Sequence, residues 1–364
     1  MAKIGLPDID ITFSQKAITA ISRSERGVLL ILCVDTVAKE LRTRTYRYEN
    51  EILAEEYTAE NLAAIKRAFL VPVNKVHVIA APAATDMSAF ASAMEGLKYN
   101  YVCCVNEEIQ QALVNYVITK NQKSKGRKYV AVVADATTAD SKYVVNVKNA
   151  SVHDVDSNAD VEMVKYLPRL ASILANLPMN RSCTYYELED IDSVDVSFIT
   201  VANDINSWID KGYLVLFKDD DVIKIARGVN SLTTITSTDT EDMRKIIIVE
   251  AQNIIIEDIF STFKDSYVGK YKNSYDNQCQ FISAVNAYFR QLAKEEILEP
   301  TYKNICSVNV ESQRNAWLSI GKTEAIDWDE NKVKNMTYKS TVFLQGNIKI
   351  LDAIEDLKFE IEME

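Results

Sequence analysis

The chain has 364 residues, of which 48% are hydrophobic and 26% are charged, and its formal net charge is −11 at neutral pH. This length predicts two folded units with extended ends, and the composition is typical of globular rather than disordered proteins. The acidic charge argues against nucleic-acid binding as the main task, because that task needs basic surface to neutralise phosphates. Only nine glycines are present, which leaves little material for phosphate-binding loops.

The six cysteines show no paired Cys-x-x-Cys spacing, which excludes a zinc ribbon or a thioredoxin-type site. We expect reduced, mostly buried thiols. The first residues lack a basic segment followed by an apolar run, and no stretch approaches the length of a membrane span. These patterns predict a protein made in the cytoplasm, with no membrane insertion and no cofactor.

The N-terminal part alternates apolar and polar residues. Ile9, Ile11 and Phe13 are separated by polar residues, which is the period-two pattern of a strand with one apolar face. The next apolar run, 28–34, suits a strand buried on both faces in the middle of a sheet. We therefore separate an N-terminal arm, 1–26, from the first folded domain.

Strand and helix patterns then alternate, which predicts a mainly parallel sheet with flanking helices and an α/β fold class. Thr58 is the expected N-terminal cap of the first helix. The expected helices are 59–70, 88–97 and 107–121, and the expected strands are 76–81, 99–105, 129–134 and 142–147.

Further elements complete this first domain. Residues 160–177 have helical spacing, although Pro168 is expected to kink or break the helix. Another helix is expected over 197–209, followed by a hairpin over 213–225 that turns through three aspartates. A polar segment then ends the α/β domain, which we place at 27–238.

The remaining chain is predicted to form an α+β domain over 239–351. Its expected helices are 241–263, which is apolar on more than one side, 275–298, which is apolar along one stripe, and a shorter one over 310–320. Two strands, 340–344 and 347–351, are expected to pair as a hairpin around Gln345 and Gly346.

The last segment, 352–364, is a second alternating arm, in which Leu357, Phe359, Ile361 and Met363 are separated by charged residues. A strand with one apolar face must pair with something, either another subunit or its own domain. The arm holds six acidic residues and one lysine, whereas 2–27 holds four basic and three acidic residues. This asymmetry modestly favours pairing between the N-terminal end of one copy and the C-terminal end of another.

Candidate catalytic and nucleotide sites are weak. His77 lies inside an apolar strand and is interpreted as a core residue, and His153 is interpreted as a solvated residue beginning an acidic loop. The run Ile320-Gly321-Lys322-Thr323 ends like a phosphate-binding loop, but Ala316 stands where that motif needs glycine. The favoured interpretation is a helix C-terminus with Gly321 near the cap.

Candidate ion and nucleic-acid sites are equally weak. Residues 154–160 resemble the opening of a calcium loop, but Ala159 and Lys165 replace the glycine and glutamate that it needs. We favour carboxylates at a helix N-terminus. The aspartates 219–221 are interpreted as a solvated hairpin tip, and the basic run 120–128 as a solvated loop without the aromatic residues that nucleic-acid stacking requires.

Three blocks of sequence carry a family resemblance. They are Gly5-Leu6-Pro7-Asp8-Ile9-Asp10-Ile11 with Ser22-Arg23-Ser24-Glu25-Arg26-Gly27, then Val249-Glu250-Ala251 through Tyr267-Val268-Gly269-Lys270 to Asn273-Ser274-Tyr275-Asp276-Asn277, and Gly346 with Asp352-Ala353-Ile354-Glu355-Asp356-Leu357. These blocks resemble contractile tail sheath proteins of phages and phage-like R-type bacteriocins of Gram-positive type. The middle, 36–236, is similar in its strand and helix pattern more than in motif.

The resemblance implies a structural subunit and no enzyme. Such sheaths are helical stacks of hexameric rings around a tail tube, and they contract to drive the tube through a target cell envelope. The resemblance implies baseplate and tail terminator proteins as further partners, assembly in the bacterial host cytoplasm, and then a place in the tail of a released particle. It also implies a subtilisin-like first domain, although no serine nucleophile motif is visible here.

The resemblance also assigns roles to residues. Both arms are expected to add strands to sheets of neighbouring subunits. Lys264, Lys270 and Lys272 are candidates for contact with an acidic tube surface, and an ordinary solvated loop is the alternative. The competing functions are a divergent α/β hydrolase or nucleotide-dependent enzyme, and an adaptor that stays monomeric. The expected inter-subunit arm residues are Ile9, Ile11, Phe13, Leu357, Phe359, Ile361 and Met363.

Overall fold

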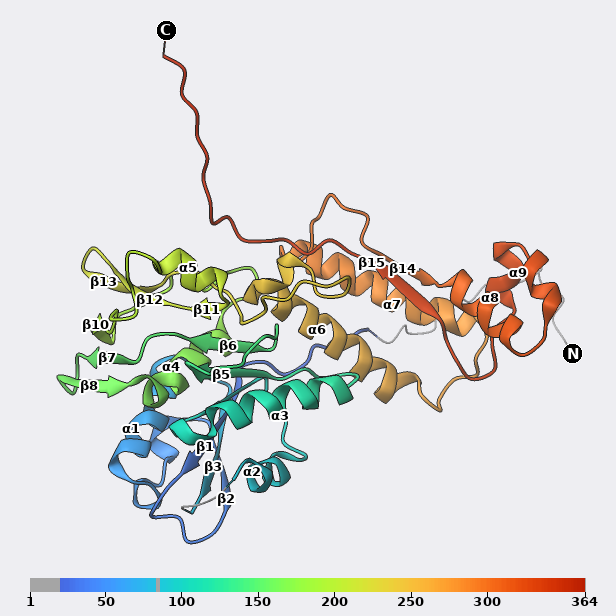
Figure 1. Ribbon diagram of the computed structural model, residues 1–364. Coiled ribbons are helices and arrows are strands. Elements are labelled where there is room, and N and C mark those ends of the chain that lie inside the picture. The colour runs from blue at the N-terminus through green and yellow to red at the C-terminus, as the bar shows by residue number, and fades with distance from the viewer. Residues whose placement is uncertain (1–19, 83–85, 364) are drawn as a thin grey trace, which may run out of the picture.

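The computed structural model describes residues 20–82 and 86–363 (Figure 1). The predicted N-terminal strand, with Ile9, Ile11 and Phe13, lies outside the described residues. The chain from residue 28 to the middle 220s forms an α/β part, and the rest forms a helical part with a small sheet.

Within the described ranges, seven strands form one sheet in the order β11-β6-β5-β4-β1-β3-β2. All neighbours are parallel except β2, which is antiparallel to β3 at one edge. The mainly parallel sheet predicted from the sequence is therefore confirmed. The strands are β1 (Val28–Val34), β2 (Arg42–Tyr46), β3 (Lys75–Ala81), β4 (Tyr101–Cys104), β5 (Val130–Ala134), β6 (Val144–Val147) and β11 (Tyr213–Leu214).

Helices cover both faces of this sheet. Side chains of β1 alternate between two cores: Leu29 and Ile31 pack on the face covered by α1 (Ala59–Arg67) and α4 (Met163–Asn176). Leu30 and Leu32 pack on the opposite face, covered by α2 (Met87–Met94) and α3 (Gln110–Lys123). Burial on both faces explains why this strand is an unbroken apolar run.

Two predicted helices have different bounds in the structure. The helix predicted over 160–177 begins only at Met163, because the preceding residues form strand β8, and it continues through Pro168 without ending. Most of its side chains are buried, and this burial outweighs one absent backbone hydrogen bond. The helix predicted over 197–209 is limited to α5 (Ile205–Asp210), which is capped by Asp204.

Smaller elements surround the main sheet. The predicted hairpin is confirmed as β12 and β13, with Asp220 in the left-handed region at its tip. The small strands are β7 (Ser151–Asp154), β8 (Ala159–Glu162), β9 (Glu187–Leu188), β10 (Ile191–Val194), β12 (Leu216–Asp219) and β13 (Val222–Ile225). Short 3-10 turns cover Glu49–Glu51, Ala54–Glu56, Ala68–Leu70, Glu107–Ile109, Glu241–Arg244 and Thr323–Asp327.

The C-terminal part is built on two long helices. They are α6 (Ile246–Thr262), which is followed by a π-helical turn (Phe263–Tyr267), and α7 (Tyr275–Lys294). The hairpin predicted around Gln345 and Gly346 is wrong, because both residues lie inside one strand, β15 (Leu344–Asn347). That strand pairs antiparallel with β14 (Ile305–Val308), which the sequence did not predict.

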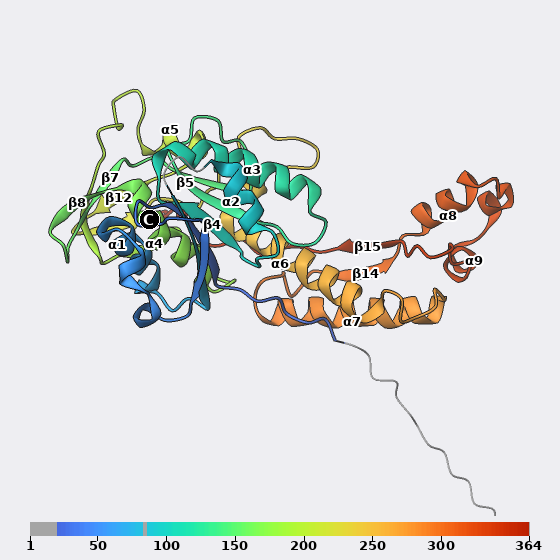
Figure 2. The ribbon, with the colours of Figure 1, turned by 90° about the horizontal axis from the view of Figure 1, so that it is seen from below.

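A helical insert, 309–343, separates β14 from β15 along the chain. It contains α8 (Val310–Ser319) and α9 (Glu330–Asn335) around a small core of Ala325, Trp328 and Val333. Figure 2 shows the insert at one end of the molecule, far from the main sheet.

Candidate assembly surfaces at the two chain ends

The first described residues, 20–26, form a strap across α6 and α7; we call them the N-terminal strap. The Ser22 amide donates to Thr262 Oγ1 at 2.9 Å, and the Ser24 amide donates to Asp258 Oδ1 at 2.6 Å. Arg23 donates to the Tyr288 hydroxyl at 3.3 Å. The part of the predicted N-terminal arm that is described is thus attached to its own C-terminal helices.

Two carboxylates on α6, the buried Asp258 and the half-buried Glu250, contact both the strap and the α/β part. The Asp258 side chain is fully buried and accepts a 2.6 Å hydrogen bond from Tyr288. Glu250 accepts from the Tyr101 hydroxyl of β4 at 2.8 Å and pairs with Arg26 of the strap at 3.2 Å. Helix α6 therefore joins the strap, the main sheet and α7.

The basic run 120–128 contributes to the same junction, so its interpretation as a solvated loop is wrong for two residues. Arg127 pairs with Glu257 of α6, and Lys128 donates to the carbonyls of Asn121 and Ser124 at the end of α3. Burial raises the pKa of Glu257, and the Arg127 guanidinium opposes that rise.

The C-terminal arm begins at a clamp, which we define as Ser182, Thr184, Arg227 and Lys245 around Glu355. The Glu355 side chain is only 5% exposed. Arg227 Nε donates to it at 3.1 Å, Ser182 Oγ donates at 3.0 Å, and Lys245 Nζ lies 3.4 Å away. Burial opposes ionisation of Glu355, but the Thr184 hydrogen bond and the Lys245 charge outweigh it and lower the pKa.

Beyond the clamp the arm makes no strand within the described range and runs away from the rest of the chain (Figure 1). Phe359 is 74% exposed and Leu357 is 87% exposed, and Ile361 and Met363 are exposed as well. The predicted alternation is present, and its apolar side chains have no core of their own subunit to pack on.

The small sheet of the C-terminal part offers a place for additional strands. Within the described ranges it has only two strands, β14 and β15, so each has one edge without a strand partner. Ile305 begins β14 and is 36% exposed. Unpaired edges are templates for strands from other chains.

The three candidate tube-contact lysines lie close together in the chain. Lys264 is on the π-helical turn, and Lys270 and Lys272 are in the loop that leads to α7. All three are exposed, and Lys270 Nζ donates to the Asp265 carbonyl.

The carboxyl end of β1 carries a buried aspartate that the sequence analysis missed. Asp35 accepts from the Thr58 amide at 2.9 Å, from the Thr58 hydroxyl at 3.1 Å and from Asn61 at 2.9 Å. Thr58 is the N-cap residue of α1, as predicted, but its side chain makes no capping hydrogen bond and its hydroxyl donates to Asp35 instead. Asp35 occupies the edge of the sheet where α/β proteins often bind ligands, but it serves to hold α1.

The two histidines have structural partners. His77 is buried in β3 and its Nδ1 lies 2.8 Å from the Thr45 hydroxyl, which confirms a core residue. Burial lowers its pKa. His153 lies in β7 and its Nδ1 is 2.8 Å from Asp160, so the prediction of a merely solvated residue is wrong; that hydrogen bond raises its pKa.

The calcium-like and phosphate-like segments also have structural roles. Residues 155–158 form the turn of hairpin β7–β8 and the flanking residues lie in its strands, so the interpretation of 154–160 as a helix N-terminus is wrong. Gly321 follows α8 with a φ of +87°, which confirms a C-terminal cap. The described part of the chain contains no group of three acidic, histidine or cysteine side chains arranged for a metal, and no helix long and apolar enough to span a membrane.

Comparison with known proteins identifies the family. The phage tail sheath protein central domain matches residues 80–231, and the phage tail sheath C-terminal domain matches residues 238–364. The chain belongs to the phage tail sheath family. A tail sheath protein of Clostridium phage phiCD119 is 29% identical over 374 residues, and the match covers 99% of each chain. Family membership confirms the prediction of a structural sheath protein rather than an enzyme.

Solved structures of sheath proteins share the fold. The crystal structure of the sheath tail protein from Desulfitobacterium hafniense has a TM-score of 0.69 at 14% identity, covering 83% of this chain and 94% of that one. The cryo-EM structure of the anti-feeding prophage helical sheath in its contracted state has a TM-score of 0.68 at 12% identity, covering 99% and 100%. The sheath fold thus extends over the whole described chain.

Sequence reasoning missed the groups that position the ends of this sheath protein. Asp258 and Glu355 gave no signal beyond being acidic residues in a helix and an acidic tail. The signal that could have indicated their importance was their position in the sequence, since both lie inside blocks that resemble the family.

Proposed function

We propose that this sheath protein assembles as a helical stack of hexameric rings around a tail tube, and that the stack contracts to drive the tube through a target cell envelope. Both arms add strands to sheets of neighbouring subunits, and β14–β15 is the acceptor sheet. Contraction uses energy stored in the extended packing of subunits, with no nucleotide hydrolysed.

One observation carries this proposal. The C-terminal arm is held firmly at Glu355 on its own subunit, and yet the apolar side chains beyond it are exposed and unpaired within the described chain. A free apolar strand next to a fixed root is suited to pairing with another copy rather than with its own core. Because the donor and acceptor surfaces differ, repetition gives an open helical assembly instead of a closed dimer.

The partners follow from the same arrangement. The tail tube is the proposed inner partner, with Lys264, Lys270 and Lys272 as its contacts. One relative's structure is described as the anti-feeding prophage baseplate, which supports a baseplate partner here; a tail terminator protein is the proposed partner at the other end. Assembly takes place in the host cytoplasm, and the product is the tail of a released phage or phage-like particle. The subtilisin-like character of the sheet stays a prediction, and the hydrolase or nucleotide-enzyme alternative is not favoured.

The test is a truncation that removes residues 357–364 and keeps the clamp. We expect a folded subunit, with unchanged circular dichroism and melting temperature, that no longer forms the tubes or ring stacks seen for the full chain by electron microscopy. A matched full-length variant with Lys358→Ala should still assemble. Tubes formed by the truncated chain, or a full chain that stays monomeric at high concentration, would contradict the proposal.

A further inference from the structure

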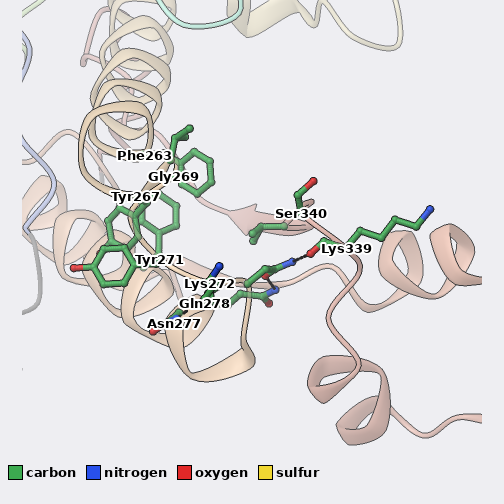
Figure 3. A pocket seen from close by; sticks show the side chains of 13 residues that line it. Phe263, Tyr267, Gly269, Tyr271, Lys272, Asn277, Gln278, Lys339 and Ser340 are labelled. Carbon is green, nitrogen blue, oxygen red and sulfur yellow. Dashed lines mark hydrogen bonds between the residues drawn. The ribbon is translucent and has the colours of Figure 1, made fainter.

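An aromatic cavity lies between the π-helical turn and loop that follow α6, the first turns of α7 and the segment that precedes β15. Its volume is about 460 Å³, and it is lined by the rings of Phe263, Tyr267, Tyr271 and Phe281. The Tyr267 ring centroid is 4.7 Å from that of Phe281 and 5.3 Å from that of Tyr271. Figure 3 shows three of these rings gathered on one side, with Lys339 and Ser340 across from them. We call this space the aromatic pocket.

The pocket contains an unsatisfied polar atom. Gln278 is only 3% exposed, and its Oε1 has no hydrogen-bond partner in the described chain, although its Nε2 donates to Asn273 at 2.7 Å. A buried acceptor without a donor costs free energy unless a partner supplies one. An apolar cavity with one buried polar group and an exposed rim has the character of a binding site.

The opposite wall of the pocket leads directly into the proposed acceptor strand. Asn273 holds this wall by donating to the carbonyls of Lys339 and Thr341 at 3.0 and 3.1 Å. Val342 lines the pocket and lies two residues before the first residue of β15, Leu344. A strand that pairs along β15 and continues past Leu344 therefore reaches the pocket.

The C-terminal arm is longer than the strand it would pair with. Residues 357–363 span about 23 Å when extended, whereas the four residues of β15 span about 13 Å. At least one apolar side chain of the arm thus extends beyond β15. The charges also match, because Lys272 and Lys339 line the pocket and no described carboxylate forms an ion pair with either, while acidic residues flank the apolar ones in the arm.

We propose that the aromatic pocket of one subunit receives an apolar side chain from the C-terminal arm of a second copy of this chain. This inference rests on the proposed assembly and adds a side-chain lock to the backbone pairing. The inserted side chain packs on the four rings, a backbone N–H of the arm donates to Gln278 Oε1, and Glu360 or Glu362 lies near Lys339 on the rim.

Disulfide cross-linking between separately purified full-length chains tests the inference. One chain carries Ser340→Cys at the pocket. The other carries cysteine at one apolar arm position, Leu357, Phe359, Ile361 or Met363, or at one polar position, Lys358, Glu360 or Glu362. The chains are mixed, assembled and oxidised, and covalent dimers are quantified on non-reducing gels. Chains without added cysteine give the background from the native thiols.

We expect at least a fivefold higher dimer yield from one or more apolar positions than from the polar positions. Replacing Ser340→Cys by Ser319→Cys, an exposed serine on α8 that does not line the pocket, should abolish that preference. Tubes that form without this preference overturn the inference and leave the proposed function standing. Failure of the parent chain to form tubes under any condition overturns both.

Discussion

Arg227 Nε lies 3.1 Å from Glu355 Oε2, and this contact fixes the point at which the C-terminal arm leaves its subunit. Arg227 also pairs with Asp356, and Lys245 pairs with Asp352 on the other side. Two cations thus hold three acidic residues of the arm root, Asp352, Glu355 and Asp356. The exposed Leu357, Phe359, Ile361 and Met363 follow this clamp.

Replacing Glu355 with glutamine should release the arm root without unfolding the domain. Arg227 and Lys245 lose a buried charged acceptor, which corresponds to about 1.5–3 kcal/mol of docking free energy. Hydrogen exchange of residues 350–356 should accelerate accordingly, and tube formation should weaken. Asp356→Asn is the matched control, because that side chain is 76% exposed and its change should be about 0–1 kcal/mol. Equal exchange rates in the two variants would exclude the clamp.

The clamp should also depend on pH. The pKa of Glu355 is lowered from its ordinary value of 4.5 in the folded chain. Its contribution to stability is therefore fully present above that ordinary value and is lost as pH falls through the lowered folded-state pKa. We expect the difference in melting temperature between the parent chain and Glu355→Gln to be constant near neutral pH and to shrink under acid. A difference in melting temperature that grows as pH falls would contradict a lowered pKa of Glu355 in the folded chain.

Asp258 should be essential for attachment of the N-terminal strap. Its replacement by alanine removes acceptors from the Ser24 amide and Tyr288 hydroxyl and a partner from Arg23. We expect a loss of about 2–3 kcal/mol in unfolding free energy, measured by urea denaturation. The control is Asp265→Ala, because Asp265 is exposed and lies seven residues further on. This substitution should change the free energy of unfolding by less than about 0.5 kcal/mol.

Asp35 should contribute to stability rather than to any chemical activity. Asp35→Ala leaves the Thr58 and Val37 amides without their acceptor, and we expect a loss of about 2–3 kcal/mol with assembly retained at low temperature. Asp86→Ala is an informative comparison, because Asp86 is an exposed cap of α2 and should cost about 1 kcal/mol. Similar losses of unfolding free energy in both variants would show that the burial of Asp35 does not contribute to stability.

The main sheet could be predicted because its central strands are apolar on both faces, so that burial is visible in composition alone. Strand β2 was missed because it lacks such an apolar pattern. Its sequence, Arg42 to Thr45, is polar throughout, and it lies at an edge of the sheet where charged residues are favourable. Hydrophobic periodicity cannot detect a strand of this kind, because its polar side chains give no apolar pattern and only its backbone hydrogen bonds hold it in the sheet.

The assembly surfaces were only partly predictable. Alternation in the tail predicted an arm with one apolar face because that pattern is local; these apolar side chains are exposed in the structure, and their pairing with another subunit stays a prediction. The β14–β15 pair was missed because its partners are separated by the helical insert, and the turn signal at Gln345 and Gly346 favoured a local hairpin instead. A Cβ at Gly346 would lie 3.9 Å from the Phe289 ring, which is an ordinary van der Waals contact, so this glycine marks neither a turn nor a close approach. Long-range partners such as Arg227 for Glu355 carry no sequence spacing to detect.

The N-terminal strap has a consequence for synthesis of the protein. Its contacts with α6 and the end of α7 join residues far apart in the chain: Ser24 and Asp258 are 234 positions apart, and Arg23 and Glu295 are 272 positions apart. A growing chain on the ribosome therefore lacks α6 and α7 until most of it has been made, and its first residues have no place to dock before then. The N-terminal strap can take its place only when the C-terminal helices have emerged, so the subunit reaches its final form at this end only when it is nearly complete.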